Sequence, residues 1–268
     1  MSDILLEAHD IRKAFGKGSR RVVAVDGISL KIPRGKTLGV LGESGSGKST
    51  LGRCLLRLIE PDAGTMVFDG ATLSGIPQGK FRPYRRHMQM IFQNPFSSLN
   101  PKMSVGEAIE DPMRIWGIGD REHRRNRVRE LLERVGIHPR FARSQPHEFS
   151  GGQQQRINIA RALALDPKFI VCDEAVSALD VSIQVQIVNL LMDLQKQLGL
   201  TYLFISHNLG VVEYLSDEVL IMRNGKPVEC APTEEIFRNP SDEYTRNLID
   251  SVPRMPRAEE LMGKGMAK

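Results

Sequence analysis

Residues 42–49 read GESGSGKS, a run of small residues that ends in a lysine and a serine. Backbone N–H groups can converge on phosphate oxygens only where bulky side chains are absent, and Gly42, Gly45 and Gly47 also permit unusual backbone dihedrals. An apolar run of the buried-strand type, TLGVLG, leads into the loop, and a helical pattern, KSTLGRCLLRLI, follows it. The sequence therefore predicts a phosphate-binding loop at the N-terminus of a helix, where the helix dipole favours anions.

The residue types in this loop predict individual contacts with a nucleoside triphosphate and its metal ion. Lys48 is expected to reach the β- and γ-phosphates, Ser49 to ligate Mg²⁺, and Thr50 to add backbone and hydroxyl contacts. The alternative is a glycine-rich turn that matches the spacing by accident, and the flanking strand and helix patterns disfavour it. The predicted nucleotide-binding residues of the loop are Gly42, Glu43, Ser44, Gly45, Ser46, Gly47, Lys48, Ser49 and Thr50.

Two adjacent acids, Asp173 and Glu174, follow the apolar run FIVC. Packing gives little reason for a buried strand to end in this way, although two solvated acids at a strand end are the alternative. Adjacent residues on a strand point to opposite faces, so the two acids should have different roles. Asp173 suits the outer shell of the Mg²⁺ ion, and Glu174 is expected to orient or deprotonate the attacking water.

Two more polar residues, Gln93 and His207, stand at the ends of the apolar runs MQMIFQ and LTYLFISH. In open α/β sheets, the carboxyl ends of the strands form the edge that holds the ligand. His207 is therefore predicted to contact the γ-phosphate and to hold Glu174 in position. Gln93 is predicted to contact Mg²⁺ or the attacking water. A histidine after a strand also has a purely structural explanation, which the order of the motifs disfavours.

The elements that must position these residues alternate between strand and helix patterns. Strand-like runs open the chain, and after residue 164 the order is strand, helix, strand, helix and a hairpin at Asn224-Gly225. This alternation predicts an α/β core with a largely parallel sheet. The helix in DVSIQVQIVNLLMDLQKQLG is expected to bury one face. The residues expected on that buried face are Ile187, Leu190, Leu191, Leu194 and Leu198.

Composition sets broad limits on the function. The 268 residues are 41% apolar and 26% charged with a net charge of +5, which is too weak a bias to indicate nucleic acid binding. The arginines of REHRRNRVRELLERVG are interpreted as the solvated face of an amphipathic helix rather than as a binding patch. The start, MSDILLEAHD, does not read as a signal peptide, and no run approaches the roughly 20 apolar residues that a membrane span needs. We therefore expect the chain to reach a membrane only by docking on another protein.

Five motifs follow one another in an order that resembles the ATP-binding subunits of ABC transporters. They are the phosphate loop, Gln93, SGGQ at residues 150–153, the apolar run before Asp173 and Glu174, and His207. The resemblance covers residues 4–255 and leaves residues 256–268 as a flexible tail. It implies a P-loop NTPase cassette of the α/β class with a mainly parallel sheet core. It also implies an N-terminal antiparallel β subdomain and a helical subdomain inserted at about residues 95–164.

The string EFSGGQQQRINIARAL resembles the signature of this family, with Phe149 where leucine is commoner. The resemblance implies that two subunits pair head to tail and hold ATP between them. The signature of one subunit then faces the phosphate loop of the other. The signature residues expected to face the partner's ATP are Ser150, Gly151, Gly152 and Gln153. Ser150 Oγ and the two glycine amides are small enough to approach a γ-phosphate, and they precede a predicted helix.

Three further parts of the sequence resemble functional elements of the family. Phe15 stands where the family stacks an aromatic ring, usually tyrosine, on adenine, although a core aromatic is the alternative. The D-loop, which touches the partner subunit, corresponds to Ser177, Ala178, Leu179 and Asp180. Asp180 or Ser182 has an alternative role as a helix N-cap. Ala175 replaces the usual proline after the catalytic glutamate, which relaxes the backbone there.

The segments NPFSSLNPKMSVGEAI and EEIFRNPSDEYTRNLIDSVP are similar to those of the oligopeptide, dipeptide and nickel importers, in particular their second, F-type ATPase subunit. This resemblance implies ATP and Mg²⁺ as ligands and a place on the cytoplasmic side of the bacterial inner membrane. The implied partners are a paralogous ATPase subunit, two transmembrane permeases and, through the complex, a periplasmic solute-binding protein, with no nucleic acid. The alternatives are a nickel or other solute importer, a soluble ABC ATPase outside transport, and a P-loop kinase or GTPase outside the family.

Overall fold

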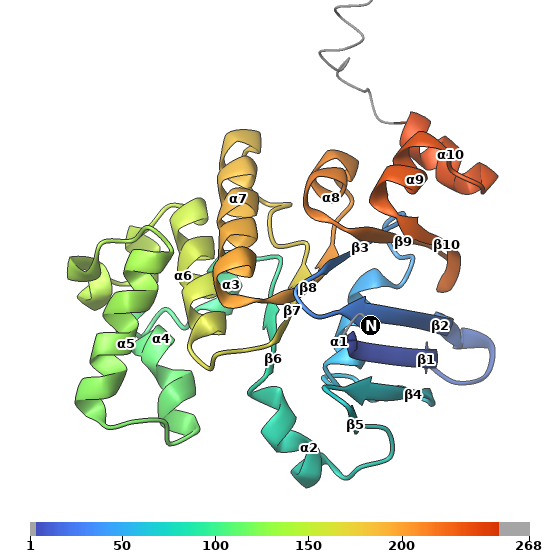
Figure 1. Cartoon of the computed structure of the whole chain (residues 1–268). Helices are drawn as coiled ribbons and strands as arrows, with labels where there is room; N and C mark the ends of the chain where they lie inside the picture. Colours follow the sequence, from blue (N-terminus) through green and yellow to red (C-terminus); the bar gives the residue numbers. More distant parts are fainter. Residues whose placement is uncertain (1–3, 252–268) are drawn as a thin grey trace, which may run out of the picture.

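The structure is a computed structural model that describes residues 4–251. It contains two sheets, with helices gathered beside and above the larger one (Figure 1). The predicted flexible tail at residues 256–268 lies outside the described residues. None of the helices described in residues 4–251 combines the length and the apolar composition that crossing a bilayer requires.

The first sheet is antiparallel and has the order β2-β1-β4-β5. Its strands are β1 (Ile4–Phe15), β2 (Val22–Pro33), β4 (Ala63–Phe68) and β5 (Ala71–Thr72), with a 3₁₀ turn η1 (Gly18–Arg20) joining the first two. The buried residues of β1 are Leu5, Leu6, Ala8 and Ile11, and irregularities in the pairing with β2 interrupt a strict alternation of apolar and polar side chains. This sheet is the antiparallel N-terminal part that the sequence predicted.

The second sheet has the order β10-β9-β3-β8-β7-β6, and all of its pairings are parallel except that of β10 with β9. Its strands are β3 (Thr37–Leu41), β6 (Met88–Ile91), β7 (Phe169–Asp173), β8 (Thr201–Ile205), β9 (Glu218–Arg223) and β10 (Lys226–Pro232). β9 and β10 form the predicted hairpin, in which Asn224 and Gly225 have φ of 50° and 79°. The mainly parallel α/β fold class is therefore confirmed.

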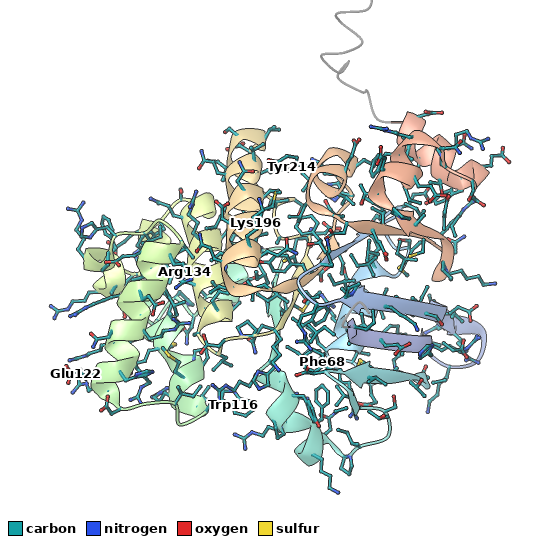
Figure 2. All side chains as sticks on the ribbon, viewed as in Figure 1. Phe68, Trp116, Glu122, Arg134, Lys196 and Tyr214 are labelled. Atoms are coloured by element: carbon teal, nitrogen blue, oxygen red, sulfur yellow. The ribbon has the colours of Figure 1, made fainter. Side chains whose placement is uncertain are left out.

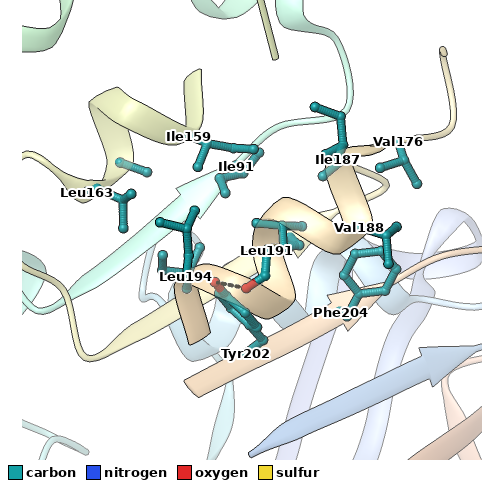
Figure 3. Close-up of a cluster of buried hydrophobic side chains, with 14 of the residues drawn as sticks. Ile91, Ile159, Leu163, Val176, Ile187, Val188, Leu191, Leu194, Tyr202 and Phe204 are labelled. Atoms are coloured by element: carbon teal, nitrogen blue, oxygen red, sulfur yellow. Dashed lines mark hydrogen bonds between the residues drawn. The ribbon is translucent and has the colours of Figure 1, made fainter. Parts of the chain in front are cut away.

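The parallel sheet separates two hydrophobic cores. On β8, Leu203 and Ile205 belong to the core shared with the antiparallel sheet, whereas Tyr202 and Phe204 belong to the core shared with the helices. This alternation follows from the period of two residues along a strand. Figure 3 shows the helical side, where the hydroxyl of Tyr202 donates a hydrogen bond of 3.0 Å to the carbonyl oxygen of Leu191.

The chain between β6 and β7 contains only helices. They are α3 (Pro95–Ser98), α4 (Val105–Ile115), α5 (Arg121–Arg134), η2 (Pro139–Arg143), η3 (Pro146–Glu148) and α6 (Gly151–Leu163). The helices outside this segment are α1 (Lys48–Leu55), α2 (Gln78–Arg85), α7 (Val181–Leu198), α8 (Leu209–Leu215), α9 (Thr233–Arg238) and α10 (Glu243–Asp250). Capping boxes start α4 and α6, because Ser104 and Ser150 each accept a hydrogen bond from a backbone N–H three residues further on.

The buried face of α7 differs at its end from the face predicted by periodicity. Ile187, Leu191 and Leu194 are buried as expected and Leu190 is partly buried, but Leu198 is 39% exposed. The helix ends there, because Gly199 takes the left-handed conformation with φ of 65° and turns the chain. Leu200, after the turn, is buried instead.

Replacing Leu191 by alanine should lower the free energy of unfolding by about 2–5 kcal/mol, because the substitution leaves a cavity among fully buried neighbours (Figure 3). Urea unfolding followed by circular dichroism measures the change. Val185→Ala is the matched control on the same helix, since Val185 is 53% exposed, and it should change the free energy by less than about 0.5 kcal/mol. Equal losses for the two variants would contradict the assignment of this core.

Candidate functional site

A hollow of about 540 Å³ opens at the carboxyl ends of the parallel strands, and we call it the phosphate-loop hollow. Its floor is the loop between β3 and α1, and one wall is the start of β2. Its opposite wall carries the side chains that follow β6 and β7. Among the predicted site residues, those lining it are Ser44, Gly45, Gly47, Lys48, Ser49, Thr50, Gln93 and Glu174.

Glycine is required at two positions of the phosphate loop. Gly42 has φ of 147°, and a Cβ there would lie 2.1 Å from the carbonyl oxygen of Met222. Gly47 has φ of 100°, and its Cβ would lie 1.9 Å from the carbonyl oxygen of Ala24. Any larger residue would collide with backbone at both points, so the loop keeps its shape only with glycine there.

Lys48 is buried and its Nζ lies inside the loop. It donates hydrogen bonds of 2.7 Å to the carbonyl oxygens of both Gly42 and Glu43, and it lies 3.4 Å from Ser46 Oγ. Burial lowers the pKa of Lys48 from its usual value, while the negative charges of Glu174, Asp173 and Glu43 act in the opposite direction. The ammonium group is thus partly desolvated next to acceptors, a state in which its attraction to an anion is strengthened.

Ser49 and Asp173 meet although they are far apart in the sequence. Ser49 Oγ donates a hydrogen bond of 2.6 Å to Asp173 Oδ1, and the guanidinium of Arg53 lies 3.7 Å from Asp173 Oδ2. Asp173 is 4% exposed, and this burial raises its pKa. A hydroxyl and a carboxylate oxygen are the hard ligands that Mg²⁺ takes, so the donor set fits this ion. Among residues 4–251, no group of three or more His, Cys, Asp or Glu could hold a metal unaided.

Glu174, Gln93 and His207 form a cluster above the phosphate loop. Gln93 Nε2 donates a hydrogen bond of 2.8 Å to Glu174 Oε2, and His207 Nδ1 lies 3.5 Å from the same oxygen. Gln93 Nε2 also lies 3.4 Å from the hydroxyl of Ser177. Gln93 thus holds the carboxylate by a hydrogen bond and His207 lies close to it, each from the segment that follows a neighbouring strand. The sequence did not predict the contact of Gln93 with Glu174.

The backbone at Glu174 leaves the strand sharply. Its φ is 49°, in the left-handed region, and its N–H donates a hydrogen bond of 2.9 Å to the carbonyl oxygen of Ile205. The next residue, Ala175, is buried, and its carbonyl oxygen accepts a hydrogen bond of 2.7 Å from Gln155 Nε2. The Ser177 hydroxyl donates to the Glu174 carbonyl oxygen at 3.0 Å. These hydrogen bonds restrain the loop in which alanine stands for the usual proline.

Three buried amides on α6 hold loops on either side of that helix, and sequence analysis missed them. Gln154 Nε2 donates to the carbonyl oxygen of Phe149 at 3.1 Å, and Asn158 Nδ2 donates to that of Pro95 at 3.3 Å. Gln155, described above, is the third, and all three are at most 2% exposed. The signal in the sequence was available, because consecutive glutamines on the buried side of a helix need hydrogen-bond partners.

The signature residues stand away from the phosphate-loop hollow of their own chain, and none of them lines it. Ser150 is the N-cap of α6, where its Oγ accepts from the N–H of Gln153 at 3.4 Å and its N–H donates to Gln153 Oε1 at 3.0 Å. A Cβ on Gly152 would lie 2.6 Å from Ile183 Cγ2, so a small residue there lets α7 approach α6. Ser150 and Gln153 are exposed.

The D-loop residues lie between Glu174 and α7. Ser177 is tied to Glu174, and Leu179 packs against the helical core. Ala178 and Asp180 are exposed. Asp180 occupies the N-cap position of α7 but makes no side-chain capping hydrogen bond, whereas Ser182 lies within the helix. Of the two candidates, Asp180 therefore stands at the N-cap position and Ser182 does not.

Phe15 does not line the phosphate-loop hollow. It ends β1 opposite Val22, which does line the hollow, and its ring is 43% exposed with Lys13 Nζ at 5.6 Å from the ring centre. Two walls that the sequence did not identify are the Val22–Ala24 stretch and Asn224 of the hairpin turn. Their place in the lining follows from the course of the backbone, and their side chains gave no chemical reason to predict it from the sequence.

Two known protein families match parts of this sequence. Residues 25–177 match the family described as ABC transporter, and residues 228–266 match the oligopeptide/dipeptide transporter C-terminal region. The chain is 52% identical over 239 residues to the glutathione import ATP-binding protein GsiA of Salmonella typhimurium, covering 89% of this chain and 38% of that protein. It is 50% identical over 249 residues to a putative peptide import ATP-binding protein of Brucella ovis, covering 93% and 78%. The chain therefore spans little more than a third of the GsiA protein.

Two solved structures share the fold. The ATP-binding cassette MJ0796, a dimer bound to ADP and Pi, matches with a TM-score of 0.77 at 28% identity and covers 85% of this chain and 99% of that one. CbiO1 from Clostridium perfringens, part of the ABC transporter complex CbiONQ, matches with a TM-score of 0.81 at 28% identity and covers 97% and 99%. Fold, motif order and sequence identity agree, and the chain belongs to the ABC transporter family of ATP-binding cassettes.

Proposed function

We propose that this chain is the ATP-hydrolysing, energy-coupling subunit of an ABC importer for di- or oligopeptides. The observation that carries the proposal is the position of Glu174. Its carboxylate lies in the phosphate-loop hollow, held by Gln93 and close to His207. A carboxylate fixed beside a phosphate-binding loop is placed to orient or deprotonate a water molecule that attacks a terminal phosphate.

In this proposal, the loop residues 42–50 hold the triphosphate with their backbone N–H groups. The ammonium of Lys48 exchanges its loop carbonyl acceptors for phosphate oxygens. Ser49 and Asp173, with Gln93 nearby, would hold Mg²⁺, which neutralises charge on the phosphates when it is bound. His207 contacts the γ-phosphate, and Phe15 stacks on adenine, for which its exposed ring leaves room.

The proposal extends to a dimer that encloses ATP between two subunits. Ser150, Gly151, Gly152 and Gln153 stand outside the hollow of their own chain, at a helix N-terminus that favours anions. They would complete the hollow of a second ATPase subunit. The D-loop, residues 177–180, would contact that second subunit as well. The relative MJ0796 was solved as a dimer. We propose a paralogue as the second subunit here.

The proposed solute is a peptide, because the relatives are named for glutathione and peptide import and residues 228–266 match the oligopeptide/dipeptide transporter region. The chain would dock from the cytoplasmic side on two permeases of the bacterial inner membrane, with a periplasmic solute-binding protein completing the system. Import of nickel or another solute is the alternative. The match at residues 228–266 disfavours an ABC ATPase that acts outside transport.

Lys48→Ala should weaken ATP binding by roughly a hundredfold, because it removes a buried charge that contacts the phosphates. Equilibrium binding of a fluorescent ATP analogue measures the loss. Lys196→Ala is the control, since Lys196 is an exposed lysine on α7 (Figure 2) and should leave affinity unchanged. Unchanged affinity in Lys48→Ala would refute the proposed role of the loop.

Glu174→Gln should still bind ATP but lower the hydrolysis rate by about 10²–10⁴-fold, because an amide cannot accept the proton of the attacking water. Phosphate release under saturating ATP gives the rate, and uptake of a labelled peptide by cells carrying the variant should fall in parallel. Glu122→Gln, an exposed change on α5, should keep the wild-type rate. Near-normal turnover of the Glu174 variant would remove this residue from the proposed chemistry.

Gly151→Asp should leave ATP binding by one subunit intact but abolish ATP-dependent dimerisation, because it brings a negative charge against the partner's phosphates. Gel filtration of the chain together with its paralogous partner and ATP, in a Glu174→Gln background that slows hydrolysis, reports the dimer. Gly79→Asp introduces the same charge on α2, where a Cβ meets nothing within 4 Å, and should dimerise normally. A dimer that survives in the Gly151 variant argues against the proposed interface.

A further inference from the structure

The C-terminal helix α10 lies beside the phosphate loop, although none of its residues lines the phosphate-loop hollow. Tyr244, in its first turn, packs partly buried against the helical core, and its hydroxyl is hidden from solvent. The backbone N–H and the carboxylate of Glu43, the second residue of the loop, lie next to that hydroxyl. Because the proposed hydrolysis gives α10 no role, its contact with the loop indicates a separate one.

The Tyr244 hydroxyl has polar neighbours but no completed hydrogen bond. Within residues 4–251, no group meets it in normal hydrogen-bond geometry. Burial raises the pKa of Tyr244 and the carboxylate of Glu43 adds to the rise, whereas the Glu43 N–H and the charge of Arg223 oppose it. A buried hydroxyl without a partner is unfavourable, so a position of the loop that supplies one is stabilised.

One peptide unit of the loop lies between Tyr244 and Lys48. The carbonyl oxygen of Gly42 and the N–H of Glu43 belong to the same planar unit, in which they point in opposite directions. Lys48 Nζ donates a hydrogen bond of 2.7 Å to that carbonyl oxygen and another of 2.7 Å to the Glu43 carbonyl oxygen. Lys48 therefore holds this unit from inside the loop, while the Tyr244 hydroxyl stands beside its N–H on the outside.

The Tyr244 side chain is fixed by its surroundings. Glu229 of β10 accepts hydrogen bonds of 2.8 Å and 2.7 Å from the N–H and the hydroxyl of Ser241, which ties down the approach to α10. Asp242 caps the helix by accepting a hydrogen bond of 2.7 Å from the Tyr244 N–H. The guanidinium of Arg223 lies over the Tyr244 ring at 4.6 Å, a cation–π contact. The ring is thus anchored to β9, to β10 and to the start of its own helix.

The β9–β10 hairpin that carries Arg223 is also joined to the phosphate loop. The N–H of Gly225 donates a hydrogen bond of 3.0 Å to the carbonyl oxygen of Ser46. The carbonyl oxygen of Met222 stands where a Cβ on Gly42 would fall. Tyr244 and the loop therefore share one scaffold, so a shift of the Gly42–Glu43 peptide alone can complete the missing hydrogen bond.

We propose that Tyr244 is a positioning residue for the phosphate loop, and that its hydroxyl accepts a hydrogen bond from the Glu43 N–H once Lys48 has turned to a phosphate. This role rests on the proposed function, in which Lys48 exchanges its loop carbonyl acceptors for phosphate oxygens. The exchange releases the Gly42–Glu43 peptide from inside the loop, and Tyr244 then holds it from outside. The C-terminal helix thereby raises the affinity for the triphosphate without contacting the nucleotide.

Tyr244→Phe removes the hydroxyl and keeps the ring beneath Arg223. The change should raise the dissociation constant of ATP about fivefold, because one hydrogen bond of the nucleotide-bound loop is lost. Isothermal titration calorimetry on the full chain measures this constant. Tyr214→Phe is the matched control, since Tyr214 is 60% exposed on α8 (Figure 2) and its hydroxyl donates to Asn189 of α7 at 3.2 Å. The control should bind ATP as tightly as the wild type.

Two further measurements separate positioning from a merely structural role. The urea midpoint of Tyr244→Phe without nucleotide should be no lower than that of the wild type, because the hydroxyl makes no hydrogen bond until Lys48 moves. Amide hydrogen exchange in peptides that cover the phosphate loop should be faster in the variant at saturating ATP. Without ATP, the exchange rates of the variant and the wild type should agree.

Arg223→Gln tests what holds the ring in place. The substitution removes the cation–π contact and should weaken ATP binding about threefold. In Arg223→Gln/Tyr244→Phe, the dissociation constant should stay within about twofold of that of Tyr244→Phe alone, because Arg223 acts through the Tyr244 hydroxyl.

Unchanged ATP affinity in Tyr244→Phe, with normal binding by the wild type, would overturn the role of Tyr244 and leave the proposed function standing. A lowered urea midpoint without nucleotide, together with unchanged exchange at saturating ATP, would make Tyr244 a structural residue only. Additive losses in the double variant would refute the action of Arg223 through the hydroxyl. Failure of the wild type to bind ATP would overturn the proposed function, and this role with it.

Discussion

Four parallel strands, in the order β3-β8-β7-β6, end at one edge of the central sheet, and the whole phosphate-loop hollow depends on that edge. Their register aligns the ends: Val40 pairs with Ile205, and Ile205 pairs with Asp173. The residues just beyond these pairs begin the phosphate loop and carry His207 and Glu174. Antiparallel pairing of any of these strands would send its last residue to the opposite edge, so the chemistry rests on strand direction.

The buried amides of α6 connect this edge with the helices. Gln155 holds the backbone after Glu174, Asn158 holds the backbone after Gln93, and Gln154 holds the turn before Ser150. Each donor lies in an apolar core, where an unmade hydrogen bond costs about 1–3 kcal/mol. Displacement of α6 relative to the sheet would therefore break all three or carry the loops with it. This gives the signature helix a physical link to the residues that surround Glu174.

One chain presents only part of what the proposed reaction needs. Lys48, Ser49 and Glu174 line one hollow, whereas Phe15 and the signature residues 150–153 of the same chain do not line it. A nucleotide bound in the hollow would thus expose its other face to whatever covers it, which is the physical basis for the proposed dimer.

The sequence by itself determined the local parts of this protein. The phosphate loop, the strand that ends at Asp173, the strand that ends two residues before Gln93, and the hairpin at Asn224 were predictable. They depend on glycine geometry, on periodicity and on turn chemistry within short windows. Contacts between distant segments were decided by tertiary structure alone. Three such contacts depend on sheet order and register, which no local pattern encodes. They are the Ser49–Asp173 hydrogen bond, the hydrogen bond from Gln155 to the Ala175 carbonyl oxygen, and the place of residues 22–24 in the lining of the phosphate-loop hollow.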